Sequence, residues 1–291
     1  MLGQAQQRPE NATARYRYGP LALLVAALLA IFVFRAALAG SRTMPSTFHL
    51  FDALTVAGAL LILLKGRGHL RRGDWIIALG LGSVVGVGML FATLFSPYPF
   101  WGLVRSSGGQ ALIRGGFTAV AALGGLVIMR RGGPVPFPLA NADWPSAWRA
   151  IFSGLLVGLP LAVLNVFALQ LTQGDPVTWQ NPLAALLDAL QPAVVEEIIY
   201  RFALWGLLWL VLHSSLPDQA VWLAGLLAML AHNFAHFDDL FLSAPLTALG
   251  MGAVMALLWG VPPLILARRR GLEAALAFHW IQDVARFLAG F

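Results

Sequence analysis

Long runs of apolar residues, separated by short polar stretches, extend over almost the whole sequence. Several of these runs reach the roughly 20 residues that an α-helix needs to cross the hydrocarbon of a bilayer. The runs predict membrane-spanning helices at 19–40, 48–64, 75–96, 111–129, 149–171, 193–212, 219–237, 244–267 and 272–290. The expected fold class is therefore all-α, a polytopic transmembrane helical bundle with about 8–9 transmembrane helices.

Two segments outside the spans have their own patterns. Residues 1–18 are polar and carry three arginines, so we expect a disordered cytoplasmic tail. A signal peptide is the alternative for the first run, because residues 37–39 resemble a cleavage site, but Arg35 favours a retained helix. Residues 181–190 predict a separate short helix, which Pro192 would end. Glycines four residues apart, as at Gly154 and Gly158, predict close helix packing.

Composition narrows the class of protein. Hydrophobic residues make up 59% of the chain and charged residues only 11%, whereas soluble domains carry about 25% charged residues. The absence of cysteine excludes disulfides, thiolate metal sites and a cysteine nucleophile.

The net charge of +6 does not point to nucleic acid, because the basic residues cluster in short loops between the runs. With the N-terminus inside, nine crossings would place every basic cluster in the cytoplasm and the acidic loops at 172–181 and 238–239 outside.

Ionisable residues within the spans are the strongest functional signal. A charge at a helix centre costs roughly 2.5–3.5 kcal/mol, so such residues are usually paired and often functional. Glu196 and Glu197 are adjacent in an apolar segment. Glu197 and Arg201 are four residues apart and can pair on one helix face. Glu196 points about 100° away and lacks a local partner. A purely structural role for the triplet is the alternative interpretation.

Two later spans carry further polar pairs at the same spacing. His232 and His236 share one helix face, and so do His279 and Asp283. Each pair also has a structural interpretation: interfacial histidines in the first case, and a self-satisfied pair that helps packing in the second. Taken together, a carboxylate, two or three histidines and another carboxyl on successive helices are the parts of a general-base site. Such a site can activate water and stabilise an oxyanion.

The order of the motifs resembles a known family. Glu196–Arg201 reads EExxxR, Ala228–His232 ends in a histidine on the following helix, and His279–Asp283 reads HxxxD. This order is similar to that of the type II CAAX prenyl endopeptidase family, which includes bacteriocin-processing and self-immunity proteins (the Abi, or CPBP, group). The resemblance covers roughly residues 150–291. The family pattern has an aromatic residue where this chain has Ala228.

The resemblance implies a glutamate-dependent intramembrane protease, a hydrolase, with no metal or other cofactor. It implies that Glu196 is the general base, that His232 assists it, and that Asp283 joins His279 on the oxyanion side. Glu197, Arg201 and His236 would be supporting residues. The expected division of the chain is a tail at 1–18, transmembrane helices of unassigned role at 19–148, and a protease domain at 149–291.

The expected substrate is a membrane-associated peptide or membrane protein, lipidated or not, in the cell or inner membrane of a bacterium or archaeon. No nucleic-acid partner is expected. Two alternatives stay open. One is a metalloprotease with Glu196, His232, His236 and His279 as ligands, although no HExxH motif is present. The other is non-catalytic: a self-immunity or peptide-binding membrane protein, or a proton-coupled transporter.

Overall fold

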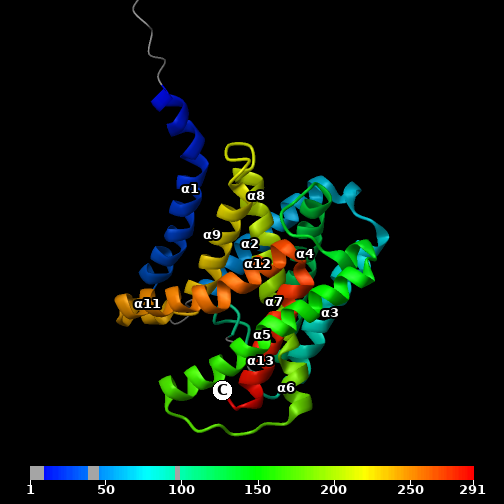
Figure 1. The fold of residues 1–291 in the computed structure, drawn as a ribbon, viewed down its shortest axis with the longest axis vertical. Helices are drawn as coiled ribbons and strands as arrows, with labels where there is room; N and C mark the ends of the chain where they lie inside the picture. The colour runs from blue at the N-terminus through cyan, green and yellow to red at the C-terminus, as the bar shows by residue number, and fades with distance from the viewer. Residues whose placement is uncertain (1–9, 39–45, 96–98) are drawn as a thin grey trace, which may run out of the picture.

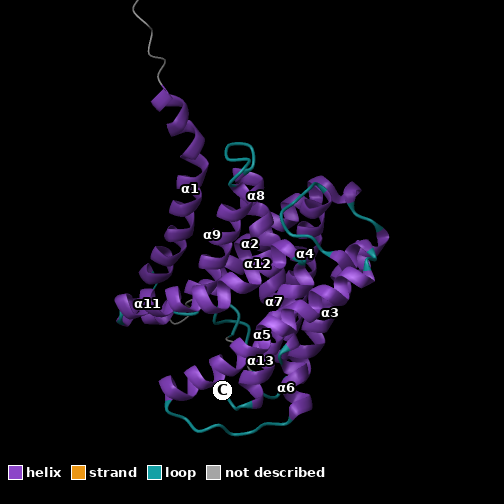
Figure 2. Cartoon of the chain, in the orientation of Figure 1, coloured by secondary structure: helices purple, strands orange, loops and turns teal. Residues whose placement is uncertain are grey.

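The protein is described by a computed structural model over residues 10–38, 46–95 and 99–291, and this part folds into helices without a β-strand (Figure 2). The α-helices, in chain order, are α1 (Glu10–Ala37), α2 (Thr47–Gly66), α3 (Arg72–Phe91), α4 (Ser107–Arg130), α5 (Trp144–Gln173), α6 (Pro182–Asp188), α7 (Leu190–Glu196), α8 (Trp205–Leu212), α9 (Ala220–Ala235), α10 (Asp238–Ser243), α11 (Pro245–Met255), α12 (Val261–Arg269) and α13 (Leu272–Leu288). Two short 3₁₀ segments, η1 (Arg67–His69) and η2 (Pro138–Asn141), and two π-helical segments, η3 (Glu197–Leu204) and η4 (Ala256–Gly260), connect them.

The polytopic helical bundle predicted from the apolar runs is confirmed. Within the described residues, six helical stretches are long and apolar enough to cross a membrane: Tyr18–Ala37, Thr47–His69, Arg72–Phe91, Ser107–Arg130, Trp144–Gln173 and Pro245–Arg269. The other three predicted runs, 193–212, 219–237 and 272–290, are also helical. Of these, α9 and α13 are shorter than the six stretches, and all three runs carry ionisable residues of the motifs.

Two boundaries differ from expectation. Residues 1–9 of the predicted tail lie outside the described residues, and α1 already begins at Glu10. The short helix α6 ends at Asp188, so Pro192 does not end it but lies in the first turn of α7. Proline is tolerated there, because the first N–H groups of a helix have no intrahelical partner.

The helices that carry the three motifs lie in the interior of the bundle. The continuous helix α7–η3–α8 contacts α2, α4, α9 and α13, and α13 packs along α5 (Figure 1). Ile198, Ile199 and Tyr200 of η3 are almost fully buried. By contrast, α1 lies at the edge of the molecule in Figure 1, with most of its surface exposed. Arg35 near its end pairs with Asp238 and Asp239 of α10.

Glycine brings the helices into backbone contact, as the four-residue spacing predicted. A side chain at Gly154 on α5 would collide with the carbonyl oxygen of Ala274 on α13. On α3, a Cβ at Gly82 would lie 2.6 Å from the carbonyl oxygen of Gly115 on α4. These contacts fix the helices that surround the site, because backbone atoms cannot move aside as flexible side chains do.

The adjacent glycines of α4 provide a matched test of this packing. A Cβ at Gly115 would lie 2.7 Å from the carbonyl oxygen of Gly82, whereas a Cβ at Gly116 meets nothing within 4 Å. We expect Gly115→Ala to destabilise the protein by about 1–3 kcal/mol through overpacking. Gly116→Ala should be neutral or stabilise by up to about 1 kcal/mol, because alanine favours helix. Thermal unfolding of both variants in detergent measures the difference, and equal stabilities would contradict the close contact.

Candidate active site

All seven residues singled out from the motifs line one cavity of about 990 Å³. The cavity lies between α2, α4, α5, α7, η3, α9, α11, η4 and α13, so its wall draws on both halves of the chain. The motif residues in its lining are Glu196, Glu197, Arg201, His232, His236, His279 and Asp283. The fold therefore brings together polar side chains that are up to 87 residues apart (196 to 283) in the sequence.

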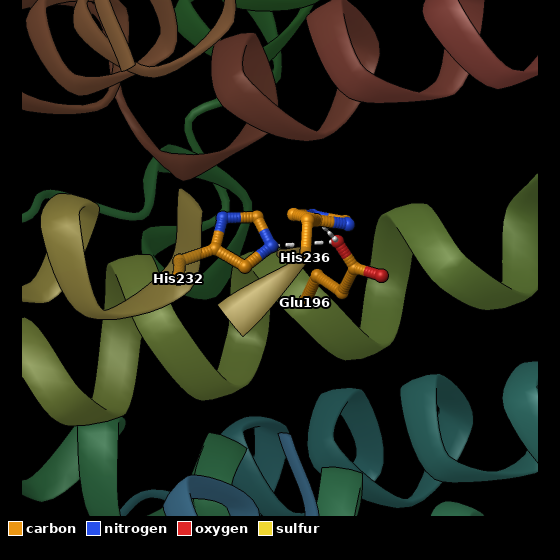
Figure 3. A group of neighbouring side chains, drawn as sticks. All are labelled: Glu196, His232 and His236. Atoms are coloured by element: carbon orange, nitrogen blue, oxygen red, sulfur yellow. Dashed lines mark hydrogen bonds and ion pairs between the residues drawn. The ribbon is translucent and has the colours of Figure 1, made fainter. Parts of the chain in front are cut away.

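Glu196, the last residue of α7, faces His232 of α9 and His236, the residue that directly follows this helix (Figure 3). Its Oε2 atom lies 2.7 Å from Nε2 of His232 and 4.0 Å from Nε2 of His236. Because an ionised carboxylate only accepts hydrogen bonds, the short contact requires Nε2 of His232 to donate. In the described part of the chain Oε1 of Glu196 has no hydrogen-bond partner, so one oxygen of the carboxylate remains available to a ligand.

Glu197, one residue later, has different surroundings. Its side chain is 0% exposed, whereas that of Glu196 is 20% exposed. Oε1 of Glu197 accepts from Arg201 one helical turn away and lies 2.8 Å from Nδ1 of His279 on α13. Glu197 is thus neutralised by a buried arginine and holds the ring of His279. Of the two adjacent glutamates, Glu196 is the one that presents a carboxylate oxygen to the cavity without an arginine bound to it.

The third motif completes the ring of polar groups. Nε2 of His279 lies 3.6 Å from Oε2 of Glu196 and 3.4 Å from Oδ2 of Asp283. Asp283 also pairs through Oδ1 with Arg286, at 3.0 Å. Since Nδ1 of His279 is held by Glu197, its Nε2 atom is the one directed toward Glu196 and Asp283.

The helix changes its winding at the site. Glu196 ends the α-helical turn, and Glu197 begins the π-helical segment η3. Such wide turns are rare and occur frequently at functional sites. Nothing in the sequence VVEEIIYR indicated this change of winding, because the four-residue spacing of Glu197 and Arg201 is that of an ordinary α-helix.

Comparison with known proteins supports the resemblance drawn from the motifs. Residues 178–285 match the family model described as Rce1-like: Type II CAAX prenyl endopeptidase Rce1-like. The expected resemblance is confirmed over this segment, which contains Glu196, His232, His279 and Asp283. No curated protein and no solved structure matched the chain. Together with the six long apolar helices among the described residues, the match indicates an integral membrane protein that contains a segment similar to this protease family. The bacterial or archaeal location stays a prediction.

The Rce1-like segment does not contain the whole wall of the cavity. Residues 1–177 lie outside the match, yet Phe48, His49 and Asp52 of α2 and Arg114 of α4 line the same cavity. The sequence did carry a signal for three of them, because His49, Asp52 and Arg114 are polar residues within predicted spans. These residues come close to the motif residues only through the packing of α2 and α4 against the later helices, and sequence motifs do not specify that packing. Arg286, also missed, follows the matched segment.

Aromatic rings pack against His232 and His236. Tyr200 stacks on His232 with ring centroids 4.7 Å apart, and Phe48 meets the ring of His236 edge-on at 4.8 Å. Ala228, at the position where the family pattern has an aromatic residue, is buried. In this chain, the aromatic contacts to His232 come from η3 and α2.

Proposed function

We propose that the protein is an intramembrane endopeptidase in which Glu196 activates water to hydrolyse a peptide bond. The observation that carries the proposal is the contrast between two adjacent glutamates. Glu197 is fully buried and paired with Arg201, whereas Glu196 faces the cavity with one oxygen held by His232 and the other available. A positioned carboxylate with a free oxygen next to a histidine fits a general base.

The proposed reaction balances its protons through Glu196. Water bound at Oε1 of Glu196 transfers a proton to the carboxylate while its oxygen attacks the carbonyl carbon of the scissile bond. With both ring nitrogens protonated, His279 donates from Nδ1 to Glu197 and is placed to stabilise the oxyanion of the tetrahedral intermediate by donating from Nε2. The intermediate collapses with cleavage of the C–N bond, and the proton on Glu196 passes to the leaving amine.

Asp283 fits a positioning role better than a donor role at the oxyanion. Its carboxylate pairs with Arg286 and approaches Nε2 of His279, and an ionised carboxylate cannot donate a hydrogen bond. We propose that Asp283 orients His279, which changes the part that the family resemblance implied for it.

The proposed substrate is a membrane-associated peptide or protein segment. Apolar side chains of α5, α11 and η4, including Leu164, Val254 and Leu258, line the cavity beside the polar groups. An apolar substrate segment, or a lipid attached to it, would be buried there. We keep the predicted protease domain at 149–291 and propose that α2 and α4 also belong to the catalytic unit. Residues of both helices line the wall of the cavity.

The test compares the peptides of membranes that contain the wild type with those of membranes that contain Glu196→Gln. New peptide termini present only with the wild type would support the proposal and would identify the substrate. Identical termini in both would contradict it. They would favour a non-catalytic peptide-binding role or proton transport.

A metal-dependent protease is the second candidate, because Glu196, His232 and His236 place three ligand atoms within 4.8 Å of one another. Two atoms that share a tetrahedral zinc ion at about 2.1 Å are separated by about 3.4 Å. Oε2 of Glu196 and Nε2 of His232 are closer, at 2.7 Å, which suits a direct hydrogen bond. The arrangement therefore fits the glutamate mechanism better than zinc.

His236 separates the two candidates. Under the glutamate mechanism, we expect His236→Gln to lower the cleavage rate by much less than the roughly 100-fold that loss of a general base costs. A chelator should leave the rate unchanged. Rates with and without 1,10-phenanthroline, together with metal analysis of the purified protein, check this. Stoichiometric zinc, with activity lost to the chelator and restored by zinc, would establish the metal-dependent candidate instead.

A further inference from the structure

Arg114 is a charged residue in a membrane-spanning helix outside the Rce1-like segment. It lies in α4, and its side chain lines the same cavity as Glu196. A charged side chain within a membrane span is costly, so it normally faces a partner, a polar cavity or a ligand. The cavity is therefore the feature that explains its position.

The other arginines of the cavity wall have partners, and Arg114 differs from them. Arg201 pairs with Glu197, and Arg286 pairs with Asp283. Within the described residues Arg114 makes no ion pair, and its Nε atom is buried without a hydrogen-bond partner. A guanidinium group carries five N–H donors and no acceptor, so Arg114 offers the cavity a cation with unused donors.

The surrounding groups only partly compensate this charge. Asp52 and His49 of α2 lie close enough to interact with Arg114 electrostatically. Asp52 faces the hydroxyl of Tyr200, and it is not within ion-pair distance of Arg114. The guanidinium group is thus neither neutralised by contact, as Arg201 is, nor directed at water outside the bundle.

We propose that Arg114 binds a carboxylate of the peptide substrate, an inference that rests on the proposed function. The anions available in an unmodified peptide are its C-terminal carboxylate and the side chains of aspartate and glutamate. A guanidinium group recognises either through paired charge-assisted hydrogen bonds. Binding of this carboxylate at Arg114 fixes the distance from the anion to Glu196, and thereby selects which peptide bond is cleaved.

The test uses protein carrying Glu196→Gln, so that bound peptides are not cleaved. Two libraries of N-dodecanoyl random hexapeptides are offered in detergent, one with free C-terminal carboxylates and one with C-terminal carboxamides. Captured peptides are sequenced and their affinities measured. The same selection is repeated with Arg114→Gln, with Arg114→Lys, and with Arg131→Gln as the control at an exposed arginine at the end of the same helix.

Preference for the free-acid library by about tenfold or more, lost in Arg114→Gln and partly kept in Arg114→Lys, supports recognition of the C-terminus. Enrichment of aspartate or glutamate within the carboxamide library, again dependent on Arg114, supports a side-chain carboxylate. The inference is overturned if the Glu196→Gln protein with Arg114 intact shows no preference for carboxylates in either library. This result does not depend on whether the Arg114 variants fold. Cleavage that depends on Glu196 would then still support the proposed function.

Discussion

Glu196→Gln should lower the rate of peptide cleavage by about 100- to 10,000-fold, the range expected for loss of a general base. Glutamine keeps the shape of the side chain and an oxygen that can accept from His232, but it cannot take a proton from water. The rate is measured on purified protein with the peptide identified from the membrane comparison. Thermal unfolding of the same sample should show a folded protein, because Glu196 is partly exposed to the cavity and not bound to an arginine.

Glu273→Gln is the matched control for this experiment. Glu273 lies at the start of α13, is buried, and accepts from the backbone N–H of Leu139. It does not line the cavity, and glutamine can also accept that hydrogen bond. Its cleavage rate should equal that of the wild type. A loss of rate as large as that of Glu196→Gln would mean that general destabilisation, and not the loss of a base, explains both variants.

Arg201→Met should destabilise the protein by about 3–5 kcal/mol, the usual cost of removing one partner from a buried ion pair. Arg201 is 3% exposed and Glu197 is 0% exposed, so neither can find water in place of the other. The variant leaves a buried Glu197 carboxylate that, among the described residues, keeps only its hydrogen bond with Nδ1 of His279. Unfolding by heat or denaturant in detergent measures the change.

The double variant Glu197→Gln/Arg201→Met shows whether the stability lost in Arg201→Met comes from the unpaired charge of Glu197 or from the lost packing of the arginine side chain. Glutamine removes the uncompensated charge and can still accept from Nδ1 of His279, so most of the lost stability should return. If the double variant is as unstable as Arg201→Met alone, the packing of the arginine side chain, and not the ion pair, maintains the fold here. A loss below about 1 kcal/mol in the single variant would show that the pair behaves as an exposed one.

The helices were predictable because bilayer-spanning segments need long apolar runs, and the described residues of the nine runs are mostly helical. The polar pairs within one helix were predictable for a similar reason, since residues four apart share a face. Glu197–Arg201 and His279–Asp283 are both in contact. Local periodicity is sufficient for such features because each depends on one element alone.

Features that depend on packing between helices could not be derived in this way. The contact of Glu196 with His232 was expected from the order of the motifs, but its geometry follows from how the continuous helix α7–η3–α8 packs against α9. The π-helical turn after Glu196 has no local sequence signature. The position of Arg114 in the cavity wall could not be predicted either, because nothing in the sequence showed that α4 would face the motif helices.

Two of the helices that wall the cavity, α5 and α11, lie at the outside of the bundle. Their large apolar side chains, such as Phe152, Leu171 and Leu246, are mostly exposed and would face lipid. A substrate confined to the bilayer would therefore meet the protein by lateral diffusion in two dimensions. The rate of encounter then depends on the mole fraction of the substrate in the membrane. Added lipid would dilute the substrate, as added solvent dilutes the substrate of a soluble enzyme.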